Sequence, residues 1–287
     1  MAVRSFSLIG AGRAGGTLAW ALVQAGYRPL ACFCPTAKGT REAVRFLGGG
    51  RAARSLGDAA AAAPLTLIAI PDRLIEPVAT ELASADLRGR VLLHLSGAQT
   101  ADALAPARTA GASVAACHPL TSLARRSRNA DAFRGVAFAI DGDDKALRAA
   151  KALARAVGGR PFLAAREGKV LYHAGAVLAS NALVTLLDLA RGLARPVGLD
   201  DEQALRAFLP LVRATLANVE DLGLEAALTG PVRRGDAATV VRHLEALPRG
   251  PVREAYVTLA RLSLDLARRA GLDDERAAAI EAVLAGC

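Results

Sequence analysis

The first half of the chain alternates short apolar runs with stretches whose apolar residues recur at helical spacing. Residues 65–70 form a continuous apolar run, which is typical of a parallel strand buried on both faces. Residues 144–157 show the spacing of an amphipathic helix. This alternation predicts an α/β fold with a doubly wound, mainly parallel sheet. The predicted strands are residues 6–9, 28–34, 52–55, 65–70, 90–95, 114–117, 136–140 and 161–163.

The pattern changes near residue 166, after which no segment resembles a strand. The expected helices are residues 167–194, 201–222, 237–247, 252–270 and 274–285. Residues 228–236 contain glycine and proline and are expected to form a loop, with Asp236 capping the helix that follows. The chain therefore divides into an α/β domain, residues 1–165, and an all-helical domain, residues 166–287.

A glycine-rich turn follows the first predicted strand and precedes a helical pattern. Gly10, Gly12 and Gly15 match the spacing G-x-G-x-x-G, with Arg13 and Ala14 between the last two glycines. In a dinucleotide site the first glycine permits the tight turn, the second lets the pyrophosphate approach, and the third lets the helix pack against the strand. The helix N-terminus attracts the phosphates. A purely structural glycine turn is the alternative.

The end of the second predicted strand indicates which dinucleotide binds. The acidic residue that holds the ribose hydroxyls in NAD-specific sites is absent after Cys34. Thr36, Lys38 and Arg41 stand there instead and suit a 2′-phosphate, so NADP is expected. A solvated loop with two cations is the alternative. NAD, a flavin or another adenine-containing ligand stays open.

Ligands of open α/β sheets bind outside the carboxyl ends of the strands. Pro71, Ser96 and His118 each follow a predicted strand. We expect Pro71 and Ser96 to contact the cofactor and His118 to face it as a catalytic residue. The alternative for His118 is a histidine that stabilises the turn before Pro119.

The first helix of the second domain carries polar residues on an otherwise apolar sequence. Lys169, His173 and Ser180 fall within about 40° of one another around an ideal helix, and Asn181 lies about 120° away. A lysine or histidine there suits proton donation to a carbonyl oxygen as hydride reaches its carbon. We expect Lys169 and His173 to be catalytic, and Ser180 and Asn181 to bind substrate. A surface lysine and a satisfied buried histidine are the alternative.

The loop at residues 228–236 is a second candidate for substrate binding. Thr229 and Arg234 lie in it, and arginine binds carboxylates and phosphates well. A solvated basic loop explains the same residues. The histidines and cysteines lack metal-ligand spacing, so no metal is expected.

Composition and charge indicate which classes of binding partner to expect. The net charge is +9, but the cations are dispersed and nearly all arginine, and aromatic residues make up 4% of the chain. This is a poor basis for binding nucleic acid. The N-terminus resembles no signal peptide, and the apolar stretch at residues 174–187 is short and interrupted by polar residues. We expect a cytoplasmic protein without a membrane span, whose four cysteines are reduced.

Three segments carry a resemblance to a known family. They are Cys117-His118-Pro119-Leu120-Thr121, Tyr172-His173-Ala174 through Ser180-Asn181, and Leu228-Thr229-Gly230-Pro231 with Arg234-Gly235-Asp236. The chain resembles bacterial Rossmann-like proteins whose helical half is the domain of unknown function 2520. More broadly it is similar to the 6-phosphogluconate dehydrogenase-like group, which includes β-hydroxyacid dehydrogenases, ketopantoate reductase and pyrroline-5-carboxylate reductase.

The resemblance implies an NADP-linked oxidoreductase that dimerises through its helical domain. In β-hydroxyacid dehydrogenases a lysine on the first long helix after the Rossmann domain is catalytic, and Lys169 resembles it in placing. His173 stands where those enzymes carry an asparagine. The His118-Pro119 pair is also similar to the turn of prephenate dehydrogenases.

Together these observations predict an NADP-dependent oxidoreductase that acts on a small, anionic carbonyl or hydroxy compound. The alternative is a non-catalytic nucleotide-binding or redox-sensing protein of the same fold.

Overall fold

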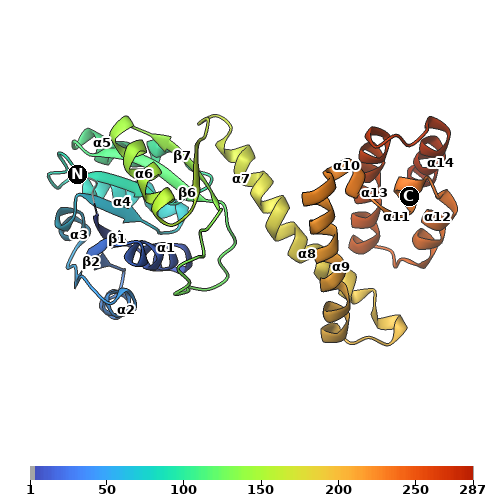
Figure 1. Ribbon diagram of the computed structural model, residues 1–287, viewed down its shortest axis with the longest axis horizontal. Coiled ribbons are helices and arrows are strands. Elements are labelled where there is room, and N and C mark those ends of the chain that lie inside the picture. Colours follow the sequence, from blue (N-terminus) through green and yellow to red (C-terminus); the bar gives the residue numbers. More distant parts are fainter. Residues whose placement is uncertain (1–3, 287) are drawn as a thin grey trace. The chain divides into compact units, whose positions relative to one another are not determined.

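A computed structural model describes residues 4–286 (Figure 1). Its sheet has the order β3-β2-β1-β4-β5-β6-β7-β8, the doubly wound arrangement that the sequence predicts. All neighbouring strands run parallel except β6 and β7. The strands are β1 (Ser5–Ile9), β2 (Arg28–Phe33), β3 (Arg51–Ala52), β4 (Leu65–Ile68), β5 (Val91–His94), β6 (Ser113–Pro119), β7 (Ala137–Gly142) and β8 (Arg160–Leu163).

Helices cover both faces of the sheet. On one face Leu18, Leu47 and Leu153 join a single apolar cluster with Phe6 and Leu8 of β1. These come from α1 (Arg13–Gln24), α2 (Ala37–Leu47) and α6 (Asp144–Ala156). The other face is covered by α3 (Leu56–Ala62), α4 (Ile75–Leu82) and α5 (Ala105–Thr109), with short 3₁₀ turns at Asp72–Leu74 and Ala101–Leu104. Because the strands are buried on both sides, their sequences are nearly continuous apolar runs.

The chain separates into two compact units, residues 1–181 and residues 182–287. The boundary predicted at residues 165/166 falls between β8 and α7 (Lys169–Val177), whereas internal contacts group α7 with the first unit. After α7 the chain continues into a π-helical turn, Leu178–Ala182.

The second unit is helical, as predicted. Its core includes Val240, Leu264 and Ile280, which come from three different helices. The predicted loop at residues 228–236 is wrong in part, because Gly230–Arg234 forms a short helix; the predicted cap is confirmed, since Asp236 accepts from the Thr239 N–H at 3.0 Å. The helices are α8 (Leu183–Gly192), α9 (Asp201–Leu222), α10 (Leu224–Ala227), α11 (Gly230–Arg234), α12 (Ala237–Ala246), α13 (Pro251–Arg269) and α14 (Asp274–Ala285), with a 3₁₀ turn at Arg195–Val197.

One helical stretch, Lys169–Gly192, meets the length and composition of a membrane span, with a mean hydropathy of 1.6 in its most apolar window. The expectation that this region is too short to span a bilayer therefore does not hold on length alone. Apolar core helices of soluble proteins meet the same criterion, but no residue of this window is buried, so the expectation of a buried helix is wrong here. Cys32, Cys34 and Cys117 are free thiols, and Cys287 lies outside the described residues.

Candidate active site

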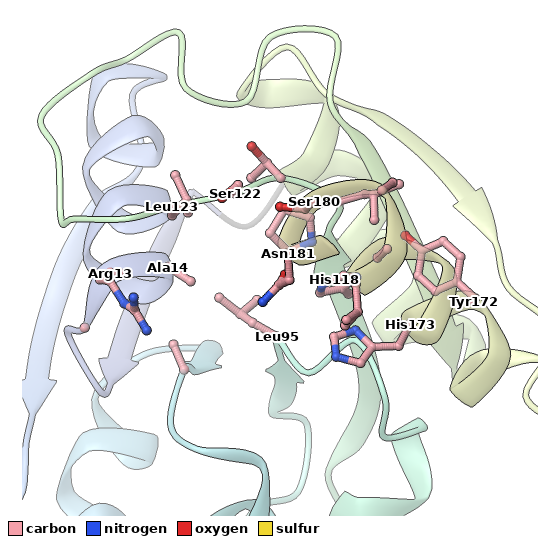
Figure 2. Close-up of a pocket in the computed structure, with 18 of the residues that line it drawn as sticks. Arg13, Ala14, Leu95, His118, Ser122, Leu123, Tyr172, His173, Ser180 and Asn181 are labelled. Carbon is pink, nitrogen blue, oxygen red and sulfur yellow. The ribbon is translucent and has the colours of Figure 1, made fainter. Parts of the chain in front are cut away.

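A cavity of about 1120 Å³ opens at the carboxyl ends of the strands in the first unit. Figure 2 shows Arg13 and Ala14 on one side, His118, Tyr172 and His173 on the other, and Ser180 and Asn181 between them. The cavity is also lined by Gly12, Ala69, Ile70, Pro71, Leu95, Pro119, Leu120, Thr121, Ser122, Leu123, Gly175, Ala176, Val177 and Ala179. Its volume is large enough for part of a dinucleotide together with a small substrate.

The glycine turn forms one wall. Gly10 has φ +87°, and a Cβ there would lie 2.3 Å from the carbonyl oxygen of Ala69, so no side chain fits. A Cβ on Gly15 would meet the same Ala69 at 2.4 Å, which is the close packing that the third glycine of the motif provides. A Cβ on Gly12 would meet nothing within 4 Å.

The start of α1 suits an anion. Gly12 is the N-cap, and no side chain caps the helix. The first-turn N–H groups, among them those of Arg13 and Ala14, are therefore left without a side-chain acceptor, and the helix dipole adds partial positive charge. These observations match what a pyrophosphate needs, so the residues present fit a dinucleotide.

The predicted 2′-phosphate residues lie next to this turn. The Gly10 N–H donates to the carbonyl oxygen of Phe33 at 2.9 Å, which joins the turn to the end of β2. Thr36 is the N-cap of α2 and accepts from the Gly39 N–H at 3.0 Å, so its hydroxyl is engaged in capping. Lys38 and Arg41 lie exposed in the first turns of the same helix. Two cations thus stand at a helix N-terminus beside the glycine turn.

Of the other two cofactor candidates, Pro71 lines the cavity and Ser96 does not. The Ser96 hydroxyl donates to Asp72 Oδ2 at 2.7 Å and accepts from the Gln99 N–H at 3.0 Å. These bonds shape the loop after β5. Ser96 therefore holds that loop, and its predicted contact with a cofactor stays a prediction.

Two histidines form the opposite wall. The rings of His118 and His173 meet edge to face, with centroids 5.9 Å apart. His118 belongs to β6 itself, near its end, and His173 to α7. They can approach because Gly97 lies between them: a Cβ there would be 2.5 Å from His173 Nδ1 and 2.8 Å from His118 Nε2.

Three buried polar atoms at this wall have no hydrogen-bond partner among residues 4–286: Nδ1 of His118, Nδ1 of His173 and the hydroxyl of Tyr172. Unpaired buried polar groups are costly, so such a cluster indicates a place for a polar ligand. Burial lowers the pKa of His118 to about 4, and the charges of His173 and Lys169 act in the same direction. His118 is therefore neutral at pH 7.

Sequence reasoning did not single out Tyr172 or Gly97. Tyr172 packs edge to face on His118 at 6.0 Å and on Phe162 at 5.9 Å. It lies about 100° from His173 on a helical wheel, so it did not share the predicted stripe. The sequence did offer one indication of a role for Tyr172, because it lies in the Tyr172-His173 segment that carries the family resemblance.

Lys169 does not line the cavity. Its side chain is fully buried, and Nζ donates to Asp141 Oδ2 at 2.6 Å. Asp141 Oδ1 accepts from the Ala101 N–H at 2.7 Å, so the carboxylate joins β7, α7 and the loop after β5. Burial lowers the pKa of Lys169, and the hydrogen bond and charge of Asp141 oppose this. Of the expected stripe of Lys169, His173 and Ser180, only His173 and Ser180 line the cavity. Lys169 is instead paired with the buried carboxylate of Asp141.

Ser180 and Asn181 both line the cavity, although an ideal helix separates them by about 100°. They belong to the π-helical turn, which is wider than an α-turn and often marks functional sites. The structure therefore brings together His118, His173, Ser180 and Asn181 of the predicted site.

Thr229 and Arg234 line a separate cavity of about 850 Å³ within the second unit. Arg233 and Arg276 also line it, together with one carboxylate, that of Asp273. Arg233 donates to the carbonyl oxygen of Ala270 at 2.8 Å. The surplus of guanidinium groups suits a carboxylate or phosphate. Binding of substrate by Thr229 and Arg234 stays a prediction.

The remaining histidines have structural partners. His94 is fully buried, accepts at Nδ1 from the Ser96 N–H at 3.2 Å, and has Nε2 2.9 Å from the Thr100 carbonyl oxygen. His243 Nδ1 lies 2.9 Å from the Tyr256 hydroxyl. Within residues 4–286 no cluster of histidine, cysteine, aspartate and glutamate has the composition of a metal site.

Two family models match the sequence. A Rossmann-like domain matches residues 2–119, and the domain of unknown function DUF2520 matches residues 136–281. No curated protein gives a significant match.

Solved structures share the fold over nearly the whole chain. A "putative NADP oxidoreductase" from Bacteroides fragilis is 22% identical, with a TM-score of 0.75, over 90% of this chain and 97% of its own. A protein from Thermotoga maritima is 24% identical, with a TM-score of 0.70, over 92% and 98%. A reductive aminase from Aspergillus terreus, in complex with NADPH and ethyl-5-oxohexanoate, is 15% identical, with a TM-score of 0.62, over 100% and 93%.

Proposed function

The chain belongs to the DUF2520 family, and from its Rossmann-like domain and cavity we propose that it is an NADP-dependent oxidoreductase. The observation that carries the proposal is a single cavity lined by both the glycine turn and the two histidines. The fold is shared with a "putative NADP oxidoreductase" and with a reductive aminase in complex with NADPH, which supports the same cofactor here.

Each part of the glycine wall has a role toward the cofactor. Gly10, Gly12 and Gly15, with Arg13 and Ala14, receive the pyrophosphate at the start of α1. Lys38 and Arg41, with Thr36 at the N-cap of α2, receive the 2′-phosphate. When bound, NADPH supplies a hydride.

The histidine wall handles the proton. As a carbonyl carbon gains hydride, its oxygen gains negative charge and requires a hydrogen-bond donor. An imidazole N–H of His118 or His173, or the Tyr172 hydroxyl, meets that need, and a proton transferred to the oxygen completes the alcohol; the group that gives up the proton regains one from solvent. Ser180 and Asn181 orient the substrate between the two walls. Lys169 acts as a positioning residue, because its ion pair with Asp141 fixes the start of α7.

The lining favours a carbonyl or hydroxy compound over an iminium ion. Arg13 is the charged residue in the lining of the cavity, and no carboxylate belongs to that lining. Burial, with the charge of Lys169, holds the pKa of His118 low although Asp72 opposes it, which supports a wall that disfavours an added positive charge. An oxygen that becomes negative is stabilised here, whereas a cationic substrate is not.

A titration tests the cofactor assignment. NADPH fluorescence should show binding, and replacing Lys38 and Arg41 by alanine should weaken NADPH about tenfold or more with little effect on NADH. Replacing Arg148 and Lys151 of α6 by alanine removes the same charge elsewhere and is the matched control. If the Lys38/Arg41 variant binds NADPH as tightly as the unchanged protein does, the assignment of the 2′-phosphate site is wrong. If the unchanged protein binds neither NADPH nor NADH, the proposed function is overturned.

A turnover screen distinguishes the enzyme from a redox-sensing protein. Small carbonyl compounds, with and without a carboxylate or phosphate, are offered with NADPH, and oxidation is followed at the nicotinamide absorbance. Turnover that is lost in His118→Ala and His173→Ala, while NADPH still binds, supports the proposed site.

We also propose that two copies of the chain associate through the helix Lys169–Gly192. Leu171 and Leu178 are seven residues apart and are 78% and 71% exposed. Exposed apolar side chains at this spacing are typical of a helix that packs against a partner. Light scattering should give a dimer mass, and Leu178→Glu should shift it toward the monomer; binding of the unchanged protein to lipid vesicles would instead indicate a membrane surface.

A further inference from the structure

The connection from β6 to β7 lies across the helices that carry the cofactor site. We refer to residues 120–134 as the strap. Its first residues, Leu120 to Leu123, line the cavity, and Figure 2 labels Ser122 and Leu123 there. The strap then reaches α1, where the Ser127 N–H donates to the Thr17 hydroxyl at 3.0 Å. A single segment thus spans from the substrate cavity to the helix of the glycine turn.

The far end of the strap is anchored on α2. Arg128 Nη2 donates to the carbonyl oxygens of Arg45 at 3.3 Å and Phe46 at 2.9 Å, near the end of that helix. Its guanidinium also lies 4.8 Å from the centroid of a Trp20 ring. These contacts pair a cation with the negative end of a helix and with an aromatic face.

Just before these anchors in the chain, Arg126 reaches the glycine turn itself. Its Nη1 donates to the carbonyl oxygen of Ala11 at 3.2 Å, and Ala11 is the residue between Gly10 and Gly12. The guanidinium lies 4.4 Å from the centroid of Phe46, which holds its plane in place.

Arg126 packs against Gly16, a glycine that the dinucleotide motif does not explain, and we call this contact the seat of Arg126. A Cβ on Gly16 would lie 2.4 Å from Cδ of Arg126 and 2.9 Å from Cγ. Gly16 follows the last glycine of the G-x-G-x-x-G spacing and is buried. Its missing side chain therefore makes room for the strap.

We propose that Arg126 is a positioning residue for the dinucleotide: it fixes the Ala11 carbonyl and so holds the glycine turn in the conformation that receives the pyrophosphate. The inference rests on the proposed function. With the carbonyl held by the guanidinium, the N–H groups of the turn stay directed to the ligand, and the fixed cation adds attraction for its phosphates. Its loss would leave the turn to be ordered by the ligand, which weakens binding.

Two neighbouring arginines provide the comparison. Arg126→Ala and Arg125→Ala each remove one exposed cation from the strap. We expect Arg126→Ala to weaken NADPH about tenfold in a fluorescence titration and Arg125→Ala to change it by less than about twofold. Arg126→Lys keeps the charge but not the planar stack, so it should recover part of the loss. The three variants should have the same thermal unfolding temperature. A weaker affinity for NADPH then reflects the position of the glycine turn and not a general loss of stability.

A double-mutant cycle tests the seat. Gly16→Ala displaces the Arg126 side chain, so it should weaken NADPH by itself and add little in the background of Arg126→Ala. Losses that multiply would show that the two residues act separately and would overturn the inference. Equal affinities of Arg126→Ala and Arg125→Ala would overturn it as well, with NADPH binding by the unchanged protein intact. If the unchanged protein binds neither NADPH nor NADH, the proposed function fails first and this inference fails with it.

Discussion

The two walls of the cavity are built in opposite ways. The glycine wall comes from one continuous turn, Gly10 to Gly15, and its shape depends on backbone that side chains would obstruct. The histidine wall is assembled from β6, α7 and the loop after β5, which meet only in the folded protein. One wall depends on local conformation, and the other depends on packing and on a buried ion pair.

The comparison shows where each wall is vulnerable. A change at Gly12 of the glycine wall can affect cofactor binding without affecting the fold, because a Cβ there faces open space. A change behind the histidine wall affects the fold first, because Lys169 and Asp141 are almost without solvent exposure. Variants of each wall should therefore separate binding from stability.

The largest effect is expected from removing one partner of the Lys169–Asp141 pair. Asp141→Asn or Lys169→Met leaves a buried charge without its partner, and such changes cost about 3–5 kcal/mol. Urea unfolding followed by circular dichroism measures the loss. The Asp86–Arg88 pair is exposed, so Asp86→Asn is the control and should change the free energy of unfolding far less. If Asp141→Asn and Asp86→Asn lowered the free energy of unfolding equally, the buried pair would contribute no more to stability than an exposed one.

A second effect behind the histidine wall depends on pH. Burial lowers the pKa of His94 to about 4, from the 6.5 expected in the unfolded chain. Between these values the unfolded chain binds a proton that the folded chain does not, so stability falls as pH falls from 6.5 toward 4. Between pH 7.5 and pH 5 the expected loss from His94 is of the order of 2 kcal/mol, and it approaches about 3 kcal/mol only below pH 4. Unfolding at pH 7.5 and pH 5 measures it, and His94→Gln should remove about half of the difference, because the pKa of His118 is lowered to about 4 as well. An unchanged pH dependence in that variant would contradict this account.

These differences also explain how much the sequence could predict. The glycine turn, the strands and the split into an α/β and a helical half are local patterns, and each was predictable. The role of Lys169 was not, because a helical wheel gives the face of a residue and not its partner, and nothing local connects it to Asp141. The π-helical turn likewise changes which side chains share a face, so Ser180 and Asn181 meet the same cavity.

Gly97→Ala tests the histidine wall directly. Its Cβ would overlap both His118 and His173, and overpacking of this kind costs about 1–3 kcal/mol. The rings must separate, so turnover should fall sharply while NADPH affinity is retained. Gly57→Ala is the control, because a Cβ there makes only ordinary contact, 3.7 Å from Ala85 Cβ, and the residue does not line the cavity. Normal turnover in Gly97→Ala would show that the close approach of the histidines is not needed.

Gly12→Ala is the converse test at the glycine wall. The added Cβ has open space around it in the protein, so the free energy of unfolding should change by less than about 0.5 kcal/mol. The same Cβ would stand where a pyrophosphate approaches the backbone, so NADPH should bind about tenfold or more weakly. A titration beside a urea unfolding curve checks both numbers. If Gly12→Ala binds NADPH normally, the open space at Gly12 does not hold the pyrophosphate, and the contrast between the two walls loses its functional meaning.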